Sequence, residues 1–187
     1  METRVLHCAI EQITDLRPSL YLEPHSIACV SVLSQYSTSP ARFDVDCSNI
    51  VSSWVQQDTK LQLEIVWSEE TAGKAERLRL TMQSNQLVEL ASVALASILT
   101  YHVVNLGQLD VMNYGGRADY RSLDIPVVLE ISGTETISKL AQRHREKIAQ
   151  ALQNPRSLDA YVVVCGFCQE GHRIRFSYHQ QEKEIEE

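Results

Sequence analysis

The sequence has no long apolar run, and this absence excludes a membrane-spanning protein. A transmembrane helix needs roughly 20 consecutive apolar residues. The longest candidate, residues 87–104, is interrupted by Glu89, Ser92, Ser97, Thr100 and His102. The first residues, METRVLHCAIEQ, also lack the long apolar stretch of a signal peptide. We therefore expect no membrane partner and a cytoplasmic location.

A disulfide framework is also absent, because the five cysteines are odd in number and scattered in spacing. Cys165 and Cys168 form a C-x-x-C, but they end the apolar segment AYVVVCGFC, which is typical of a strand. Residues three apart in a strand face opposite ways and lie about 10 Å apart. We interpret these cysteines as small buried apolar residues and not as zinc or redox ligands.

Basic residues are few, with 17 Lys and Arg against 24 Asp and Glu, which gives a net charge of −7. Neutralising phosphates requires Lys and Arg, so this balance disfavours broad, non-specific nucleic-acid binding and leaves room only for a local basic patch. The 187 residues, 44% hydrophobic and 22% charged, are typical of one globular domain, or of a domain with an appendage.

The chain contains no internal repeat and no low-complexity linker, and its first 60 residues are broken into short pieces by prolines. Within them, residues 26–36 (SIACVSVLSQY) and 41–50 (ARFDVDCSNI) are predicted to be strands. We therefore expect residues 1–60 to form an N-terminal elaboration of strands and loops. Residues 61–67 alternate apolar and polar side chains like a strand, and residues 68–83 favour a helix.

Residues 61–187 are expected to form the core, which ends in a short charged tail. Apolar residues recur at helical spacing in NQLVELASVALASILTYHVV, which begins at Asn85, and again in residues 134–155. Three strands are predicted between these helices, around residues 106–114, 117–121 and 126–132, and two more follow at 159–167 and 172–179. This order predicts an α/β fold with a mixed central sheet flanked by helices.

Two acids lie in the hairpin between the second and third of these strands. A symmetric turn over residues 122–125 places Asp119 directly opposite Glu130, and opposed side chains have Cβ atoms about 4.5–5.5 Å apart. Glu130 lies in the apolar segment PVVLEIS, so burial of its carboxylate requires a cation, a donor or a proton. A hard divalent cation, Mg²⁺ or Mn²⁺, would satisfy both acids.

With its order of helix, three strands, helix and strand, and with Asp in the second strand and Glu in the third, the segment over residues 84–178 resembles the PD-(D/E)XK nuclease superfamily. The resemblance implies a nuclease-like core, Mg²⁺ held by the acids, and hydrolysis of phosphodiester bonds in DNA. Such domains often serve restriction or anti-phage defence. The first helix of the superfamily often adds an acid, for which Glu89 is the candidate.

One departure from the motif concerns the lysine that the superfamily places two residues after the Glu. Here Ser132 occupies that position. A basic residue from the following helix is the expected substitute, and Lys139, Arg143 and Lys147 recur every four residues there. Lys139 is predicted to orient the nucleophile and Arg143 to stabilise charge on the phosphate, with Asp119, Glu130 and the Ile131 carbonyl as metal ligands. The alternative is a solvated basic helix face.

Two alternatives stay open at this point. Arg117 and Arg121 share the Asp119 face of their strand; with Lys147 they are candidate nucleic-acid contacts, but pairing with Asp119 or Glu130 would satisfy the acids without a metal. The second alternative is a catalytically inactive nuclease-fold subunit that binds a protein partner or a second copy of itself. Ser132 and the net charge favour this inactive subunit, whereas the paired acids and the basic helix face favour the enzyme.

Overall fold

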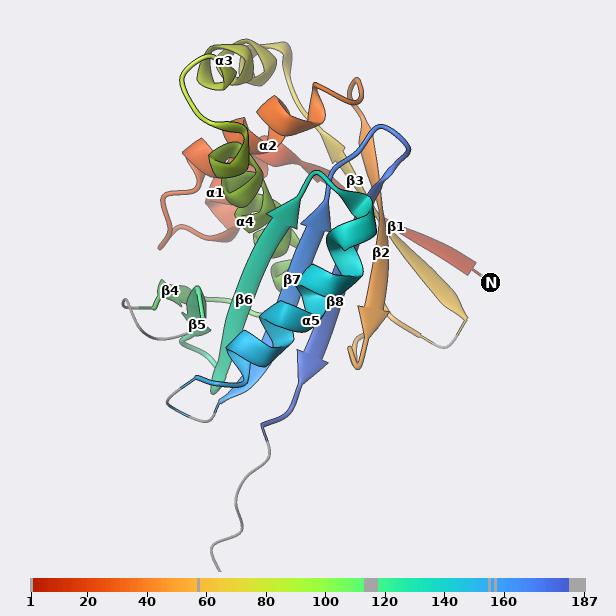
Figure 1. The fold of residues 1–187 in the computed structure, drawn as a ribbon, viewed down its shortest axis with the longest axis vertical. Coiled ribbons are helices and arrows are strands. Elements are labelled where there is room, and N and C mark those ends of the chain that lie inside the picture. Colours follow the sequence, from red (N-terminus) through yellow and green to blue (C-terminus); the bar gives the residue numbers. More distant parts are fainter. Residues whose placement is uncertain (1, 57, 113–117, 155, 157, 182–187) are drawn as a thin grey trace, which may run out of the picture.

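The fold of the computed structural model is a mixed sheet of eight strands with helices on both faces (Figure 1). The structure describes residues 2–56, 58–112, 118–154, 156 and 158–181. The strands follow the order β1-β3-β2-β8-β7-β6-β5-β4 across the sheet. Their bounds are β1 Glu2–Ala9, β2 Ala41–Ser48, β3 Thr59–Val66, β4 Leu109–Val111, β5 Tyr120–Ser122, β6 Val127–Thr134, β7 Asp159–Gly166 and β8 His172–His179. The predicted α/β class with a mixed central sheet is confirmed.

Five α-helices and two short 3₁₀ helices connect the described strands. The α-helices are α1 Ile13–Leu16, α2 Glu23–Leu33, α3 Glu69–Arg79, α4 Ser84–His102 and α5 Leu140–Ala151, and the 3₁₀ turns are η1 Ile10–Gln12 and η2 Ile137–Lys139. In the part of the chain that the structure describes, no helix combines the length and apolarity needed to cross a bilayer.

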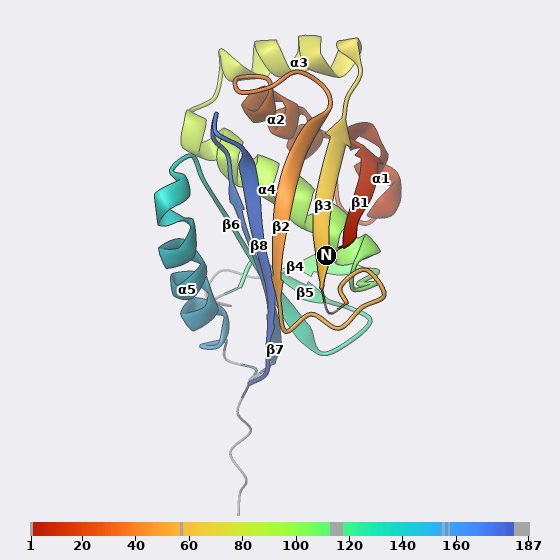
Figure 2. The same ribbon diagram turned by 90° about the vertical axis from the view of Figure 1, so that its right-hand side faces the viewer.

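The helices cover the two faces of the sheet unequally. Figure 2 shows α5 alone on one side and α1, α2 and α4 on the other. Strands β6 and β7 lie between α4 and α5 and are buried on both faces, which explains their continuous apolar sequences. Strands β2 and β3 alternate instead: Phe43 and Leu63 face the core, whereas their neighbours Asp44 and Gln62 are only partly buried.

The predicted order of elements in the second half of the chain is confirmed as α4, β4, β5, β6, α5, β7 and β8. The strands predicted over residues 41–50 and 61–67 and the helix predicted over residues 68–83 are also confirmed, as β2, β3 and α3. The strand predicted over residues 26–36 is wrong, because Glu23–Leu33 form α2, with Pro24 in the first turn. Most side chains of α2 are buried among α3, α4 and the rest of the core, so packing overrides the strand preference of its β-branched residues.

The N-terminal 60 residues contribute two strands to this one sheet. Strand β1 pairs in parallel with β3, and β2 lies between β3 and β8. One apolar core runs through both halves, from Leu6 to Phe176. Cys165 and Cys168 are buried and free, as the interpretation as apolar residues predicts.

Gly133 sets how closely α4 approaches β6. A Cβ atom at this position would lie 2.3 Å from the Ser92 hydroxyl and 2.9 Å from the main-chain oxygen of Val88, which a side-chain rotation cannot relieve. We expect Gly133→Ala to lower the free energy of unfolding by about 2 kcal/mol through overpacking, measured by urea denaturation.

Gly73 in α3 is the matched control, since a Cβ there meets nothing within 4 Å. Gly73→Ala should raise stability by roughly 0.5–1 kcal/mol, because alanine favours the helix. Equal effects of the two alanines would contradict the close approach of α4 to β6.

Candidate functional site

The hairpin of β5 and β6 brings the two predicted acids together. Tyr120 pairs with Leu129 and Arg121 with Val128, which is the register that a symmetric turn over residues 122–125 predicts. The ladder shifts at the next residue, because the main-chain N–H of Asp119 donates to the Leu129 carbonyl at 3.2 Å. The predicted register is therefore confirmed for these two pairs, and Asp119 lies just beyond them, near Glu130 but outside the regular pairing.

The Glu130 side chain is fully buried and faces α5. Its Oε1 atom accepts a hydrogen bond from the Lys147 ammonium at 2.5 Å, whereas Oε2 is buried and has no hydrogen-bond partner among the residues that the structure describes. Burial, and then the charge of Asp119, raise the pKa of Glu130 to about 7, although Lys147 acts in the opposite direction. A buried carboxylate with one oxygen unsatisfied favours either a proton or a further cation.

One carboxylate oxygen of Asp119 accepts a hydrogen bond from the main chain of β6. The main-chain N–H of Ile131 donates to its Oδ2 atom at 2.7 Å. Burial raises the pKa of Asp119 above its ordinary value; this amide and Lys147 oppose the rise, and the charge of Glu89 adds to it. Two neighbouring acids with raised pKa values are typical of functional sites, although structural networks also produce them.

Two cations reach this site from α5. The Nε–H of Arg143 donates to the Ser132 hydroxyl at 2.9 Å, so a guanidinium lies at the residue for which the resemblance predicts a lysine. The spacing follows from the packing of α5 antiparallel to β6. Two strand residues span about 6.6 Å and four helix residues about 6 Å, so Glu130 meets Lys147 and Ser132 meets Arg143.

The preference for Lys139 over the other two cations is corrected by this register. Lys139 is exposed in η2 and does not line the hollow that Asp119 shares with Arg143 and Lys147. It precedes Lys147 by eight residues, which is roughly 12 Å along a helix. The periodicity of the three cations is right, but the residue that contacts the acid is the one farthest from η2, because α5 runs back along β6.

Arg121, one of the two arginines proposed as alternative partners of the acids, pairs with another residue. Arg121 pairs with Asp110 across β4 and β5, with Nη2 and Oδ2 2.7 Å apart. It is therefore engaged with neither Asp119 nor Glu130. Arg117 lies outside the described residues.

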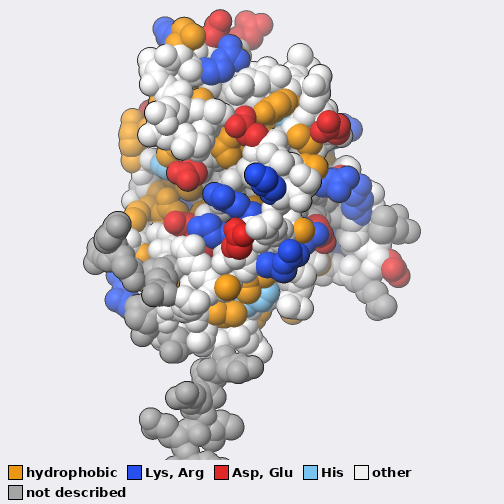
Figure 3. All heavy atoms as spheres, in the orientation of Figure 1, with side chains coloured by type: hydrophobic (Ala, Val, Ile, Leu, Met, Phe, Trp, Pro, Cys, Tyr) orange, Lys and Arg blue, Asp and Glu red, His pale blue; other side chains and the backbone are white. Residues whose placement is uncertain are grey.

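A hollow of about 940 Å³ opens beside the acids, between α4, α5 and the β4–β5 edge of the sheet. Its polar lining includes Glu89, Asp119, Ser132, Arg143 and Lys147. In Figure 3, where α5 faces the viewer, Lys and Arg side chains gather over the middle of the molecule, with acidic side chains among them. The hollow therefore brings Asp119 together with Arg143 and Lys147; the fully buried Glu130 is not part of its lining, and neither are Lys139 and Arg121.

The candidate metal ligands are two acids and not three. Within the described ranges, no group of three or more His, Cys, Asp or Glu side chains is arranged to hold a metal ion. Glu89 lines the hollow but is exposed on α4, which packs on the opposite face of β6 from α5. Its expected place beside Asp119 and Glu130 in one cluster is not observed.

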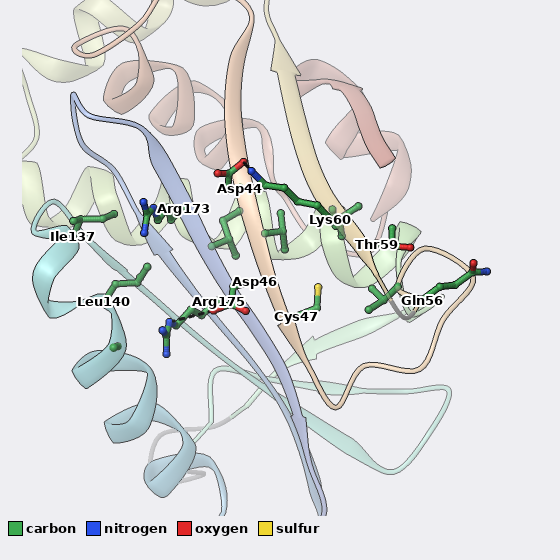
Figure 4. A pocket seen from close by; sticks show the side chains of 15 residues that line it. Asp44, Asp46, Cys47, Gln56, Thr59, Lys60, Ile137, Leu140, Arg173 and Arg175 are labelled. Carbon is green, nitrogen blue, oxygen red and sulfur yellow. Dashed lines mark ion pairs between the residues drawn. The ribbon is translucent and has the colours of Figure 1, made fainter. Parts of the chain in front are cut away.

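A second hollow, of about 610 Å³, lies on the other side of α5, over β2, β3 and β8 (Figure 4). Two ion pairs cross its strands, with Lys60 2.9 Å from Asp44 and Arg175 3.7 Å from Asp46. Paired charges of this kind are typical of the solvated face of a sheet, which is how we interpret this hollow.

Sequence reasoning missed the apolar part of the first hollow, which includes Met82, Leu90, Val93, Val111 and Met112. No local signal identifies these residues, because each resembles an ordinary core residue of its own element.

In the comparisons with known proteins, no family model, no curated protein and no solved structure matches this chain.

Proposed function

We propose that this chain is a Mg²⁺- or Mn²⁺-dependent nuclease, or a subunit derived from one, that hydrolyses phosphodiester bonds of DNA with a PD-(D/E)XK nuclease-like core. The observation that carries the proposal is the 2.9 Å hydrogen bond from Arg143 to Ser132. It supplies a cation where the motif residue supplies none, and thus fills the one gap in the motif that the sequence presents. Restriction or anti-phage defence is the context that the resemblance implies.

The donor set fits a magnesium ion. Mg²⁺ is usually held by one or two carboxylates and keeps several waters, and the unpartnered Oε2 of Glu130 is a buried oxygen beside the charge of Asp119. Asp119, Glu130 and the Ile131 carbonyl would hold the ion. When bound, such an ion polarises a phosphoryl oxygen and lowers the pKa of water.

The protein side chains supply the positive charge around the reacting phosphate. Arg143 presents a guanidinium with N–H groups beyond the one bonded to Ser132, suited to binding phosphate oxygens as charge builds on them. Lys147 fixes the orientation of Glu130 through the 2.5 Å contact and favours its charged form against the effect of burial. The two cations thus divide the work that one lysine does in the superfamily motif.

The test is DNA cleavage by the purified chain in Mg²⁺ or Mn²⁺, with duplex and single-stranded substrates. We expect the cleavage rate of Asp119→Asn and of Glu130→Gln to fall to background. The cleavage rate of Arg143→Ala should fall about 100-fold, the usual cost of removing one charge-stabilising group. Arg145→Ala is the matched control on α5, because Arg145 is exposed and outside the hollow.

Absence of cleavage together with no metal-dependent rise in melting temperature would reject the nuclease. The second candidate function is then an inactive nuclease-fold subunit for protein interaction. The Lys147–Glu130 ion pair favours it, because it satisfies half of the buried carboxylate without any metal.

A further inference from the structure

The hollow at the acids has two chemically different halves. One half is charged, as described above. The other half is an apolar wall, which we define as Met82, Leu90, Val93, Val111 and Met112. Val111 is 59% exposed, and the other four are partly exposed. Apolar surface kept open to solvent beside charged groups is typical of a ligand site.

The wall begins directly at the acids. The main-chain N–H of Met112 donates to the Asp119 carbonyl at 3.0 Å, so the last wall residue and the acid are cross-strand neighbours. Leu90 and Val93 approach from α4, where Leu90 directly follows Glu89 and Val93 lies about one turn further on. A ligand whose anionic group binds Arg143 and Lys147, which line the same hollow as Asp119, therefore places whatever is attached to that group against the wall.

We propose that the apolar wall receives an unpaired nucleobase while the neighbouring phosphate lies at Asp119, Arg143 and Lys147, so that the substrate is a single-stranded or locally unpaired nucleic acid. This inference rests on the proposed function and specifies its substrate. A nucleotide matches the hollow because it joins an anion to a flat, largely apolar group, and because about 940 Å³ is room for a ligand of that size.

An intact duplex does not fit this arrangement. Its bases are paired and stacked inside the helix, and moving one out costs a few kcal/mol. An unpaired strand avoids this cost. The charge balance supports the same conclusion: a chain with 17 basic and 24 acidic residues gains little affinity from phosphates alone, whereas burying the apolar face of a base against the wall adds affinity that does not depend on phosphate.

The experiment measures fluorescence anisotropy of labelled oligonucleotides in EDTA, which prevents turnover. The probes are dT12, the dT12·dA12 duplex, an abasic strand of the same length and charge, and rU12. We expect dT12 to bind about 10-fold more tightly than the duplex and the abasic strand. Val111→Gln and Met112→Gln should narrow this difference, whereas Leu123→Gln should not, because Leu123 is 54% exposed outside the hollow.

Val111→Gln is the decisive variant, since its exposed position spares the core. Tight binding of rU12 that also depends on Val111 supports the inference and extends it to RNA. Equal binding of dT12, duplex and abasic strand overturns it, as does an equal loss for all probes in the wall variants. Cleavage of duplex DNA without a preference for dT12 would support the nuclease function and reject only the binding of a base to the wall. Binding that depends on the bases, without any cleavage, would support the base-binding wall and reject the nuclease function.

Discussion

Replacing Arg17 with alanine is expected to lower the free energy of unfolding by about 4 kcal/mol, a large part of the 5–15 kcal/mol typical of a domain. Arg17 is 1% exposed. Its guanidinium donates to the carbonyls of Leu106 and Gly107 and, at 2.9 Å, to the Thr100 hydroxyl. Alanine would leave these acceptors buried without a donor and open a cavity.

The location of Arg17 explains why a cation is tolerated there. The guanidinium lies at the C-terminal end of α4, where it also contacts the Ser97 carbonyl at 3.3 Å and where the helix dipole is negative. The Cζ atom of Arg17 is 5.5 Å from the centre of the Tyr101 ring, a distance typical of a cation–π interaction. Burial lowers the pKa of Arg17 to about 10, so the side chain remains charged at neutral pH.

Urea unfolding of three variants would test this role. Arg17→Lys should also lose stability, because one ammonium cannot reproduce the fork of donors that contacts separate acceptors. Arg79→Ala, at an exposed position of α3, should stay within about 0.5 kcal/mol of the wild type. A loss below about 1 kcal/mol for Arg17→Ala would show that the acceptors find water or other donors.

The second large effect is a loss of stability with rising pH that originates at Glu130. Its pKa is raised to about 7 in the folded protein, against about 4.3 for an unperturbed Glu. The folded state therefore binds a proton that the unfolded state has released. This stabilising contribution is complete below the unfolded pKa and is lost as the pH rises through about 7. The expected loss is on the order of 2–3 kcal/mol.

Glu130→Gln removes this titration, because glutamine resembles the protonated acid. In EDTA, the difference in unfolding free energy between variant and wild type should grow in favour of the variant between pH 5 and pH 8.5. Added Mg²⁺ should reduce it if the site binds the ion, since the ion favours the charged carboxylate. If the difference in unfolding free energy between Glu130→Gln and wild type does not change between pH 5 and pH 8.5, the raised pKa of the buried Glu130 is contradicted.

Glu64 provides the control of opposite sign. Hydrogen bonds from Arg42 and His7 lower the pKa of Glu64 below its ordinary value. Its contribution is therefore present above the unfolded pKa and is lost only as the pH falls further. Glu64→Gln should not reproduce the growing difference seen with Glu130→Gln above pH 5.

The parts of the site that were predictable from sequence are those governed by local periodicity. The symmetric spacing around residues 122–125 is enough to predict the pairing of Tyr120 with Leu129, and so to bring Asp119 near Glu130. The four-residue spacing of Arg143 and Lys147 likewise places these two cations on one side of α5, whereas Lys139 lies in η2 before the helix begins. Both features depend on neighbours a few residues apart along the chain.

The parts that were not predictable depend on how elements pack. Selecting Lys147 over Lys139 requires the direction and offset of α5 against β6, which no spacing encodes. The helix α2 resembles a strand in sequence because all its residues from Ala28 to Leu33 are buried, so the helical period of polar residues is missing. The apolar wall is assembled from residues 82–112 and becomes visible only when α4 meets β4.

The position of β2 between β3 and β8 has a consequence for the order in which the protein assembles. Residues 43–48 pair with residues 172–177, so strands made early in synthesis wait for the last strand before the sheet can close. Pairings between such distant segments slow folding, because the intervening chain must be restrained first. Until then, the edges of β2 and β7 that β8 will cover remain open to other chains. The C-terminal strand, remote from the acids in sequence, thus joins the two halves of the sheet.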